Sequence, residues 1–175
     1  LGNDASCVVE SVGPGVTEFK VGDGAYLSWR AMRPPYSAGF YTDRMLAPVD
    51  ALQRLPAGMD LELAANIGAY TASWAMLVDA PAGRTIRSVL IVAGSGVHGT
   101  AQTHIARHLG MTVITLVSSD EKAAYSKANG AHHTINYRTE NIVERVRALT
   151  DGEGVDLIVD HLGGPNFTDY FDMLA

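Results

Sequence analysis

From residue 88 onward, short apolar runs alternate with amphipathic stretches of about ten residues. This rhythm is typical of βαβ units, in which crossover helices join parallel strands. We expect strands over residues 88–93, 111–117, 133–135 and 155–160, and helices over 97–109, 120–129 and 140–150. The sequence therefore predicts an α/β fold containing part of a Rossmann doubly wound parallel sheet. Its four strands should lie in the order 3-2-1-4, where a complete sheet has about six.

The first half of the chain has a different pattern, rich in turn residues and β-branched residues. Short strands are expected around residues 7–12 and 40–47, and a tight turn at Gly13-Pro14-Gly15. Helical periodicity follows over residues 60–78 and breaks at residues 80–83. We place a domain boundary there, so that residues 1–80 form a β-rich domain with linking helices and residues 81–175 form the Rossmann domain.

A glycine-rich turn joins the first expected Rossmann strand to its helix, with the sequence Gly94-Ser95-Gly96-Val97-His98-Gly99. In a GxGxxG turn the glycines permit a tight turn, close approach of the backbone to a pyrophosphate, and packing of helix on strand. The amides at the helix N-terminus then face the phosphates. The motif predicts a dinucleotide site at Gly94, Ser95, Gly96, Val97 and Gly99. The alternative is a glycine turn that binds no ligand.

The end of the second expected strand decides which dinucleotide would bind. An acidic side chain there would hold the ribose hydroxyls of NAD, but the strand ends at Ser118-Ser119. Asp120 and Glu121 follow at a helix start, where they would compensate the helix dipole. Lys122 could instead meet the 2′-phosphate of NADPH, helped by the hydroxyls of Ser118 and Ser119. The alternative is a capping box formed by Ser118 and Glu121, with Lys122 a solvated surface charge.

Composition excludes several classes of function. A net charge of −6 argues against nucleic-acid binding, and no apolar run reaches the roughly 18 to 20 residues that span a bilayer. No basic, apolar leader is seen at the start, so we expect a cytoplasmic protein. The one cysteine, Cys7, rules out an internal disulfide and a four-cysteine zinc site.

Three histidines, His98, His104 and His108, are candidates for binding a metal ion or a phosphate. His104 and His108 stand four apart on an expected helix, but no third ligand completes a site, so surface or packing roles are expected. His98 lies inside the glycine turn and could approach a phosphate; an exposed residue at a helix start is the alternative.

Several motifs together carry a resemblance to a known family. Residues 3–13 (NDASCVVESVG) and 16–23 (VTEFKVGD) resemble the catalytic-domain signature of medium-chain dehydrogenases/reductases. Residues 93–101 (AGSGVHGTA), 135–138 (INYR) and 152–156 (GEGVD) are similar to the quinone oxidoreductase branch. The resemblance implies a GroES-like catalytic domain before the Rossmann domain, with the cofactor held between the two.

The resemblance also implies roles for individual residues. Gly96, Val97 and Gly99 would contact the pyrophosphate, and Ser118, Lys122 and Tyr137 would surround the 2′-phosphate of NADPH. Thr71 would lie near the nicotinamide. These roles leave the catalytic residues unassigned.

The chemistry implied is zinc-free reduction of a quinone or an α,β-unsaturated carbonyl by hydride transfer from NADPH. Zinc-dependent members carry a His-Glu pair where this sequence has Asn3-Asp4. Members of the family are longer and form homodimers through a Rossmann edge strand that is absent here, so the chain resembles a fragment truncated at both ends. The alternative is a non-catalytic nucleotide-binding protein or an inactive truncated member of the same family.

Overall fold

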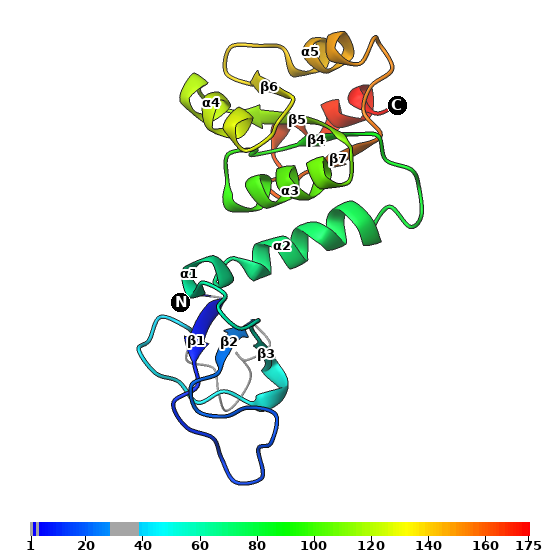
Figure 1. Ribbon diagram of the computed structural model, residues 1–175. Coiled ribbons are helices and arrows are strands. Elements are labelled where there is room, and N and C mark those ends of the chain that lie inside the picture. Colours follow the sequence, from blue (N-terminus) through cyan, green and yellow to red (C-terminus); the bar gives the residue numbers. More distant parts are fainter. Residues whose placement is uncertain (1, 3, 29–38) are drawn as a thin grey trace. The chain divides into compact units, whose positions relative to one another are not determined.

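The computed structural model describes the chain except residues 1, 3 and 29–38 (Figure 1). The chain divides into two compact units, Leu1–Gly68 and Ala69–Ala175. The domain boundary expected at residue 80 lies within the second unit and stays a prediction.

In the described part of the first unit, three strands form an antiparallel sheet in the order β1-β2-β3. They are β1 (Ala5–Val8), β2 (Gly24–Leu27) and β3 (Leu52–Arg54). The central strand β2 is buried on both faces: Leu27 packs with Phe40 and Ala51, and Tyr26 packs with Leu55. The unit is therefore β-rich, as the sequence predicts.

The prediction of a strand over residues 40–47 is wrong. The segment is irregular and is followed by a short 3₁₀ helix, η2 (Val49–Ala51), which leads directly into β3. Local hydrogen bonds replace strand pairing: the Thr42 amide donates to the carbonyl of Phe40 at 2.9 Å, and its hydroxyl donates to the carbonyl of Arg44 at 2.9 Å.

The helical periodicity over residues 60–78 is divided among three elements. Helix α1 (Leu61–Ala64) begins at Asp60, whose carboxylate accepts a hydrogen bond from the amide of Leu63 at 3.0 Å. Helix α2 (Ile67–Trp74) continues into a π-helical segment, η3 (Ala75–Asp79).

In the second unit the described strands form a four-stranded parallel sheet in the order β6-β5-β4-β7, which confirms the predicted order 3-2-1-4. The strands are β4 (Ser88–Ile91), β5 (Thr112–Val117), β6 (His133–Asn136) and β7 (Leu157–Val159). The helices are α3 (Val97–His108), α4 (Asp120–Ala128), α5 (Ile142–Leu149) and a 3₁₀ segment, η4 (Pro165–Met173). The predicted α/β fold class is confirmed, and each expected element is found within a few residues of its bounds.

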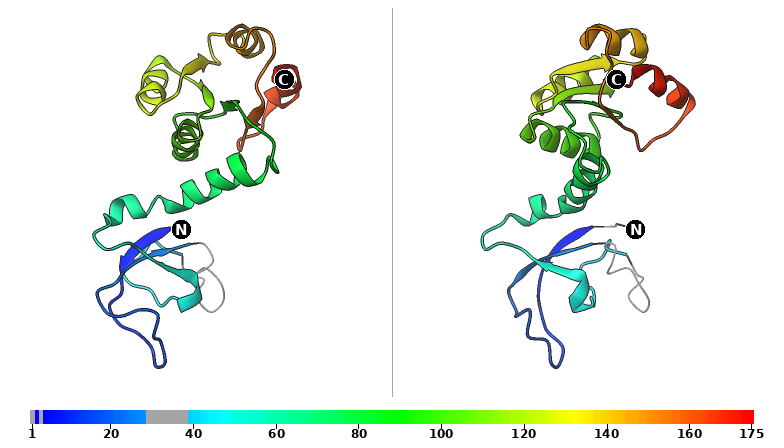
Figure 2. Two further views of the ribbon diagram at one scale, coloured as in Figure 1. Left: turned by 45° about the vertical axis from the view of Figure 1, so that its right-hand side comes forward. Right: turned by 90° about the vertical axis from the view of Figure 1, so that its right-hand side faces the viewer.

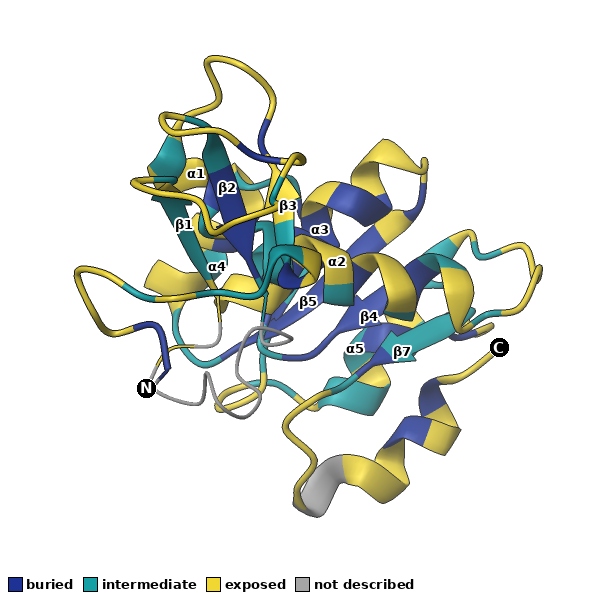
Figure 3. Ribbon diagram, turned by 90° about the horizontal axis from the view of Figure 1, so that it is seen from below, coloured by how far each residue is buried: buried dark blue, intermediate teal, exposed yellow. Residues whose placement is uncertain are grey.

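Alternating side chains of the central strands fill two separate cores in this unit. Val89 and Ile91 pack on the face covered by α3, whereas Leu90 packs on the face covered by α5 and η4. Figures 1 and 2 show α3 and α5 on opposite sides of the sheet. All three residues are fully buried, and β4 and β5 appear almost wholly buried in Figure 3. This two-faced burial explains why the strands read as continuous apolar runs in the sequence.

Candidate functional site

The glycine-rich turn lies at the carboxyl end of β4, where each glycine meets a different constraint. A Cβ at Gly94 would overlap the side chain of Thr115 on the neighbouring strand. A Cβ at Gly99 would overlap the carbonyl of Ala93 and the backbone of Gly94. Gly96 has more room, since its Cβ would approach only the Ala93 carbonyl, at 3.3 Å. Gly94 and Gly99 are thus required by packing, while Gly96 leaves the turn open on its outer side.

At the start of α3, which follows the turn directly, several backbone amides remain available as hydrogen-bond donors. The Gly96 amide donates to the carbonyl of Ala93 at 2.9 Å, and the Thr100 amide donates to the carbonyl of Gly96 at 2.8 Å. Gly96 is the N-cap and provides no side chain. The amides of the first turn, including that of Val97, therefore lack intrahelical acceptors, and with the positive end of the helix dipole they suit an anion.

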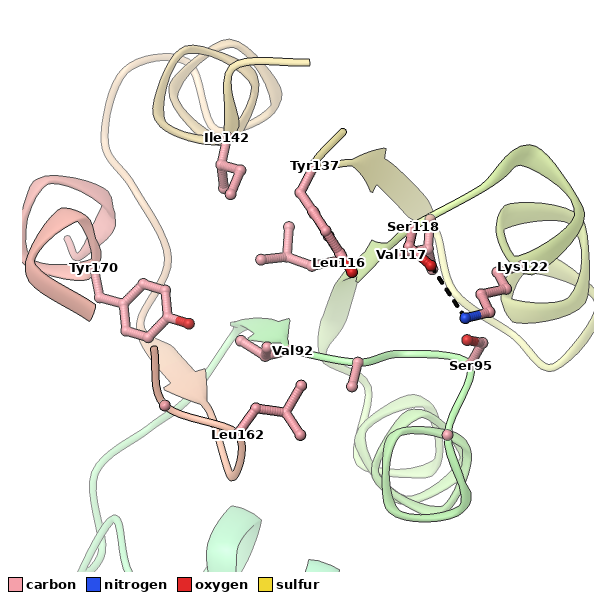
Figure 4. Close-up of a pocket in the computed structure, with 13 residues that line it drawn as sticks. Val92, Ser95, Leu116, Val117, Ser118, Lys122, Tyr137, Ile142, Leu162 and Tyr170 are labelled. Carbon is pink, nitrogen blue, oxygen red and sulfur yellow. Dashed lines mark hydrogen bonds between the residues drawn. The ribbon is translucent and has the colours of Figure 1, made fainter. Parts of the chain in front are cut away.

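A cavity of about 570 Å³ opens beside this turn, within the second unit (Figure 4). Residues from all four strand ends contribute to it. The lining consists of Val92, Ala93, Ser95, Gly96, Leu116, Val117, Ser118, Lys122, Tyr137, Ile142, Leu162, Gly163 and Tyr170. The position fits the rule that ligands of open α/β sheets bind outside the carboxyl ends of the strands.

One end of the cavity is polar. The Lys122 ammonium donates to the hydroxyl of Ser118 at 3.1 Å, and Ser95 lies beside it (Figure 4). Tyr137 joins the lining from the segment that follows β6, and its amide donates to the carbonyl of Val117 at 3.1 Å. No aspartate or glutamate is among the described residues that line the cavity. A cation and hydroxyl groups there suit a phosphate better than a pair of ribose hydroxyls.

The two adjacent serines have different surroundings. Ser119 is the N-cap of α4, and its hydroxyl accepts a hydrogen bond from the Lys122 amide at 3.3 Å. The capping box considered for Ser118 and Glu121 is therefore wrong, because the cap falls one residue later. Asp120 lies in the first turn of α4 and accepts a hydrogen bond from the Asn136 side chain at 3.3 Å.

The other end of the cavity is apolar, and sequence reasoning missed it. Ile142, Leu162 and Tyr170 come from segments that follow β6 and β7 (Figure 4). Burial, and then the charge of Asp160, raise the pKa of Tyr170 to about 12, so its hydroxyl stays a donor at neutral pH. The available signal was position: all three residues follow the carboxyl ends of strands in the parallel sheet that carries the glycine-rich turn.

Comparison with known proteins agrees with this geometry. Residues 98–175 match the family model described as zinc-binding dehydrogenase. A 2-haloacrylate reductase from Burkholderia is 38% identical over 99% of this chain and 51% of its own length. Quinone oxidoreductase from Pseudomonas syringae superposes with a TM-score of 0.85 at 33% identity, covering 100% of this chain and 52% of that one. The Escherichia coli quinone oxidoreductase complexed with NADPH gives a TM-score of 0.82 at 26% identity, covering 100% and 52%.

Over nearly its whole length the chain is similar in sequence and fold to members of the medium-chain dehydrogenase/reductase superfamily. It spans about half the length of the curated relatives it matches. The predicted combination of a β-rich first part with a partial Rossmann sheet agrees with the fold of these solved relatives.

The remaining predicted site residues lie outside the cavity lining. Gly94, Val97 and Gly99 belong to the turn and to the first residues of α3, next to the lining residue Gly96. Ser119 caps α4, and Thr71 is an exposed residue of α2. The structure therefore brings together Ser95, Gly96, Ser118, Lys122 and Tyr137 around one cavity, and the roles of all ten predicted residues stay predictions.

The description of the matching family model names zinc. Among the described residues, no three or more His, Cys, Asp or Glu side chains gather where they could hold a metal ion. Of the Asn3-Asp4 pair, Asn3 lies outside the described residues, and the Asp4 carboxylate accepts a hydrogen bond from the hydroxyl of Tyr26. In the same described ranges, no helix combines the length and the apolar character needed to cross a membrane.

Proposed function

We propose that this chain carries the NADPH site of an oxidoreductase that reduces a quinone or an α,β-unsaturated carbonyl by hydride transfer without zinc. The observation that carries the proposal is the polar end of the cavity, where Lys122 of α4 bonds to Ser118 after β5 and no carboxylate of the described residues lines the wall. The NADPH complex of the E. coli relative supports the choice of cofactor.

Each part of the cofactor has a matching set of groups. The pyrophosphate would lie on the amides at the start of α3, at Gly96, Val97 and Gly99, with Gly94 and Ser95 forming the turn. The adenosine would lie in the cavity, against the apolar end. When bound, NADPH supplies the hydride, and the protein orients it.

The 2′-phosphate would lie at the polar end of the cavity. Lys122 would neutralise part of its charge, and the hydroxyls of Ser118, Ser119 and Tyr137 would donate hydrogen bonds. Thr71 would contact the nicotinamide.

The substrate class follows from two relatives. One reduces 2-haloacrylate, which is an activated alkene, and another is a quinone oxidoreductase. Both substrates can accept a hydride without a Lewis acid, so the proposed reaction needs no zinc. Residues 1–80 would form part of the GroES-like catalytic domain, residues 81–175 would form the Rossmann domain, and the whole protein would be a cytoplasmic homodimer.

Two measurements test the proposal. Fluorescence titration should show tighter binding of NADPH than of NADH, and oxidation of NADPH should depend on an added quinone or enone. Equal affinity for both cofactors would overturn the assignment of the polar end. Saturable NADPH binding without turnover in the whole protein would favour the non-catalytic alternative.

A further inference from the structure

Two histidines from distant parts of the sequence meet at the glycine-rich turn. His98 is the second residue of α3, and His161 lies in the segment that follows β7. Their ring centroids are 5.5 Å apart, with the rings inclined at 62° in an edge-to-face arrangement. Both residues are exposed, so each ring keeps access to solvent and to a ligand.

The pair stands beside the place where a pyrophosphate would bind. The strands β4 and β7 are neighbours in parallel register, with Ile91 opposite Val159, so the segments after them emerge at the same edge of the sheet. His98 belongs to the first turn of α3, whose amides face the anion, and Leu162, the residue after His161, lines the cavity. The two residues therefore come close to lining residues of the cavity in sequence, and their rings meet each other beside the helix N-terminus.

An anion at this place would change the protonation of the pair. Histidine gains its charge between about pH 5 and 8, and two imidazolium rings this close repel each other. A pyrophosphate beside both rings would offset that repulsion and accept a charge-assisted hydrogen bond from each. Binding would then take up protons, and affinity would rise as the pH falls.

Other ionisable groups lie on the segments and helices around the pair. The carboxylate of Asp160, which precedes His161, accepts hydrogen bonds from the amides of Leu162 at 2.8 Å and Gly163 at 3.2 Å. That carboxylate also faces the hydroxyl of Tyr170 on η4. The further ionisable groups on these elements include His104, Arg107 and His108 on α3, Asp169 and Asp172 on η4, and, on α4, Lys122, which bonds to Ser118, with Asp120, Glu121 and Lys127. The Asp160 carboxylate is therefore held by hydrogen bonds on its own segment.

We propose that His98 and His161 form a proton-dependent clamp for the pyrophosphate of the cofactor. The clamp rests on the proposed function, because it requires a dinucleotide on the glycine-rich turn. It adds to that function a pH dependence of the affinity for the dinucleotide. The two histidine side chains that set it are neither GxGxxG glycines nor contacts of the 2′-phosphate.

The experiment compares two probes in the whole protein by calorimetry from about pH 6 to pH 8. NADP⁺ carries both the pyrophosphate and the 2′-phosphate, whereas adenosine 2′-monophosphate carries only the latter. A phosphate monoester itself takes up a proton as the pH falls through about 6, and that uptake weakens its binding to a cation, so the second probe measures the opposing effect. The double variant His98→Gln/His161→Gln removes both charges, and His108→Gln is the matched control at the far end of α3.

The clamp predicts that the double variant loses about tenfold in NADP⁺ affinity at pH 6 and less than about twofold at pH 8. Its affinity for adenosine 2′-monophosphate and the behaviour of His108→Gln should not change. A purely structural role for the ring pair would instead lower the unfolding temperature and shift affinity equally at every pH, which would overturn the clamp. An unchanged pH profile for NADP⁺ in the double variant would overturn it as well. If the parent protein binds neither probe at any pH, the proposed function itself fails, and the clamp fails with it.

Discussion

Replacing Lys122 with alanine tests the polar end of the cavity most directly. Lys122 is exposed and lies in the first turn of α4, with its ammonium 3.1 Å from the Ser118 hydroxyl. The Lys122→Ala change removes the cation but keeps the backbone amide that donates to Ser119, so the helix cap should survive. Alanine is also a strong helix former. The perturbation is therefore confined to the charge that faces the ligand.

The magnitude follows from the exposure of the ammonium. A charge-assisted hydrogen bond contributes about 1.5 to 3 kcal/mol, and solvent screening favours the lower end for an exposed lysine. About 1.4 kcal/mol corresponds to a tenfold change in Kd. Lys122→Ala should therefore weaken NADPH binding about tenfold and leave NADH binding within about twofold, since NADH has no 2′-phosphate.

Fluorescence titration of both cofactors checks the prediction. Lys127→Ala is the matched control, because Lys127 lies in the last turn of the same helix, is exposed, and does not line the cavity. The difference between parent and variant should also shrink as salt rises from about 0.05 to 0.5 M, since salt screens an exposed ion pair. An equal loss of NADPH and NADH affinity in Lys122→Ala would refute the reasoning, because it would show that the lysine acts on a part common to both cofactors.

Three further predictions concern packing, pH and metal. Gly99→Ala should destabilise the protein by about 1 to 3 kcal/mol in urea unfolding, because the new Cβ overlaps backbone, while Gly96→Ala should cost clearly less. Burial alone would raise the pKa of Asp156, but hydrogen bonds from the Arg87 amide and from Ser88 hold it below its usual range. The contribution of Asp156 to stability is then present above about pH 4 and is lost as the pH falls through the lowered pKa. Asp156→Asn should therefore lower the free energy of unfolding by about 1 to 2 kcal/mol at pH 7 and by little in acid. Asp151→Asn is the control and should not show this pH-dependent loss. Elemental analysis of protein purified without a histidine tag should find no stoichiometric zinc, and a full equivalent would contradict the zinc-free proposal.

The sequence predicts the Rossmann part of the fold well because local and long-range signals agree there. Strands such as β4 are buried on both faces and therefore appear as uninterrupted apolar runs. The glycines at 94 and 99 are required by packing, so the motif that marks them also fixes where the strand ends. The strand predicted over 40–47 is not formed, because no described strand pairs with the segment and local hydrogen bonds of Thr42 take the place of pairing.

Half of the candidate site was also accessible from the sequence. The polar end follows from a rule about the tip of the second strand, so Ser118 and Lys122 could be named from position alone. The apolar end depends on where the segments after β6 and β7 fold back, and Ile142 and Tyr170 carry no motif. The pairing of His98 with His161 depends on strand order as well, since only the adjacency of β4 and β7 brings them together.

Substitutions of Ser118 and Ser119 can distinguish a contribution to ligand binding from a contribution to the stability of α4. The two residues are neighbours with the same side chain, yet one hydroxyl meets Lys122 at the cavity and the other caps α4. Loss of an N-cap costs about 0.5 to 2 kcal/mol, so Ser119→Ala should lower the free energy of unfolding by about that amount. Ser118→Ala should leave unfolding unchanged, because its hydroxyl supports no backbone donor of the helix.

Binding should show the reverse order. Ser118→Ala removes the hydroxyl that orients the Lys122 ammonium, and the loss of one such hydrogen bond, about 0.5 to 1.5 kcal/mol, should weaken NADPH binding by a few fold. Ser119→Ala should change NADPH affinity less, since its hydroxyl is already bonded to the backbone. Urea unfolding and NADPH titration measure the stability and the affinity of both variants. The structure predicts that Ser119→Ala loses more stability and that Ser118→Ala loses more affinity. If Ser119→Ala lost more NADPH affinity than Ser118→Ala at unchanged stability, the cap would not be its main role, and the 2′-phosphate would have to lie closer to the start of α4 than to the Ser118 side of the cavity.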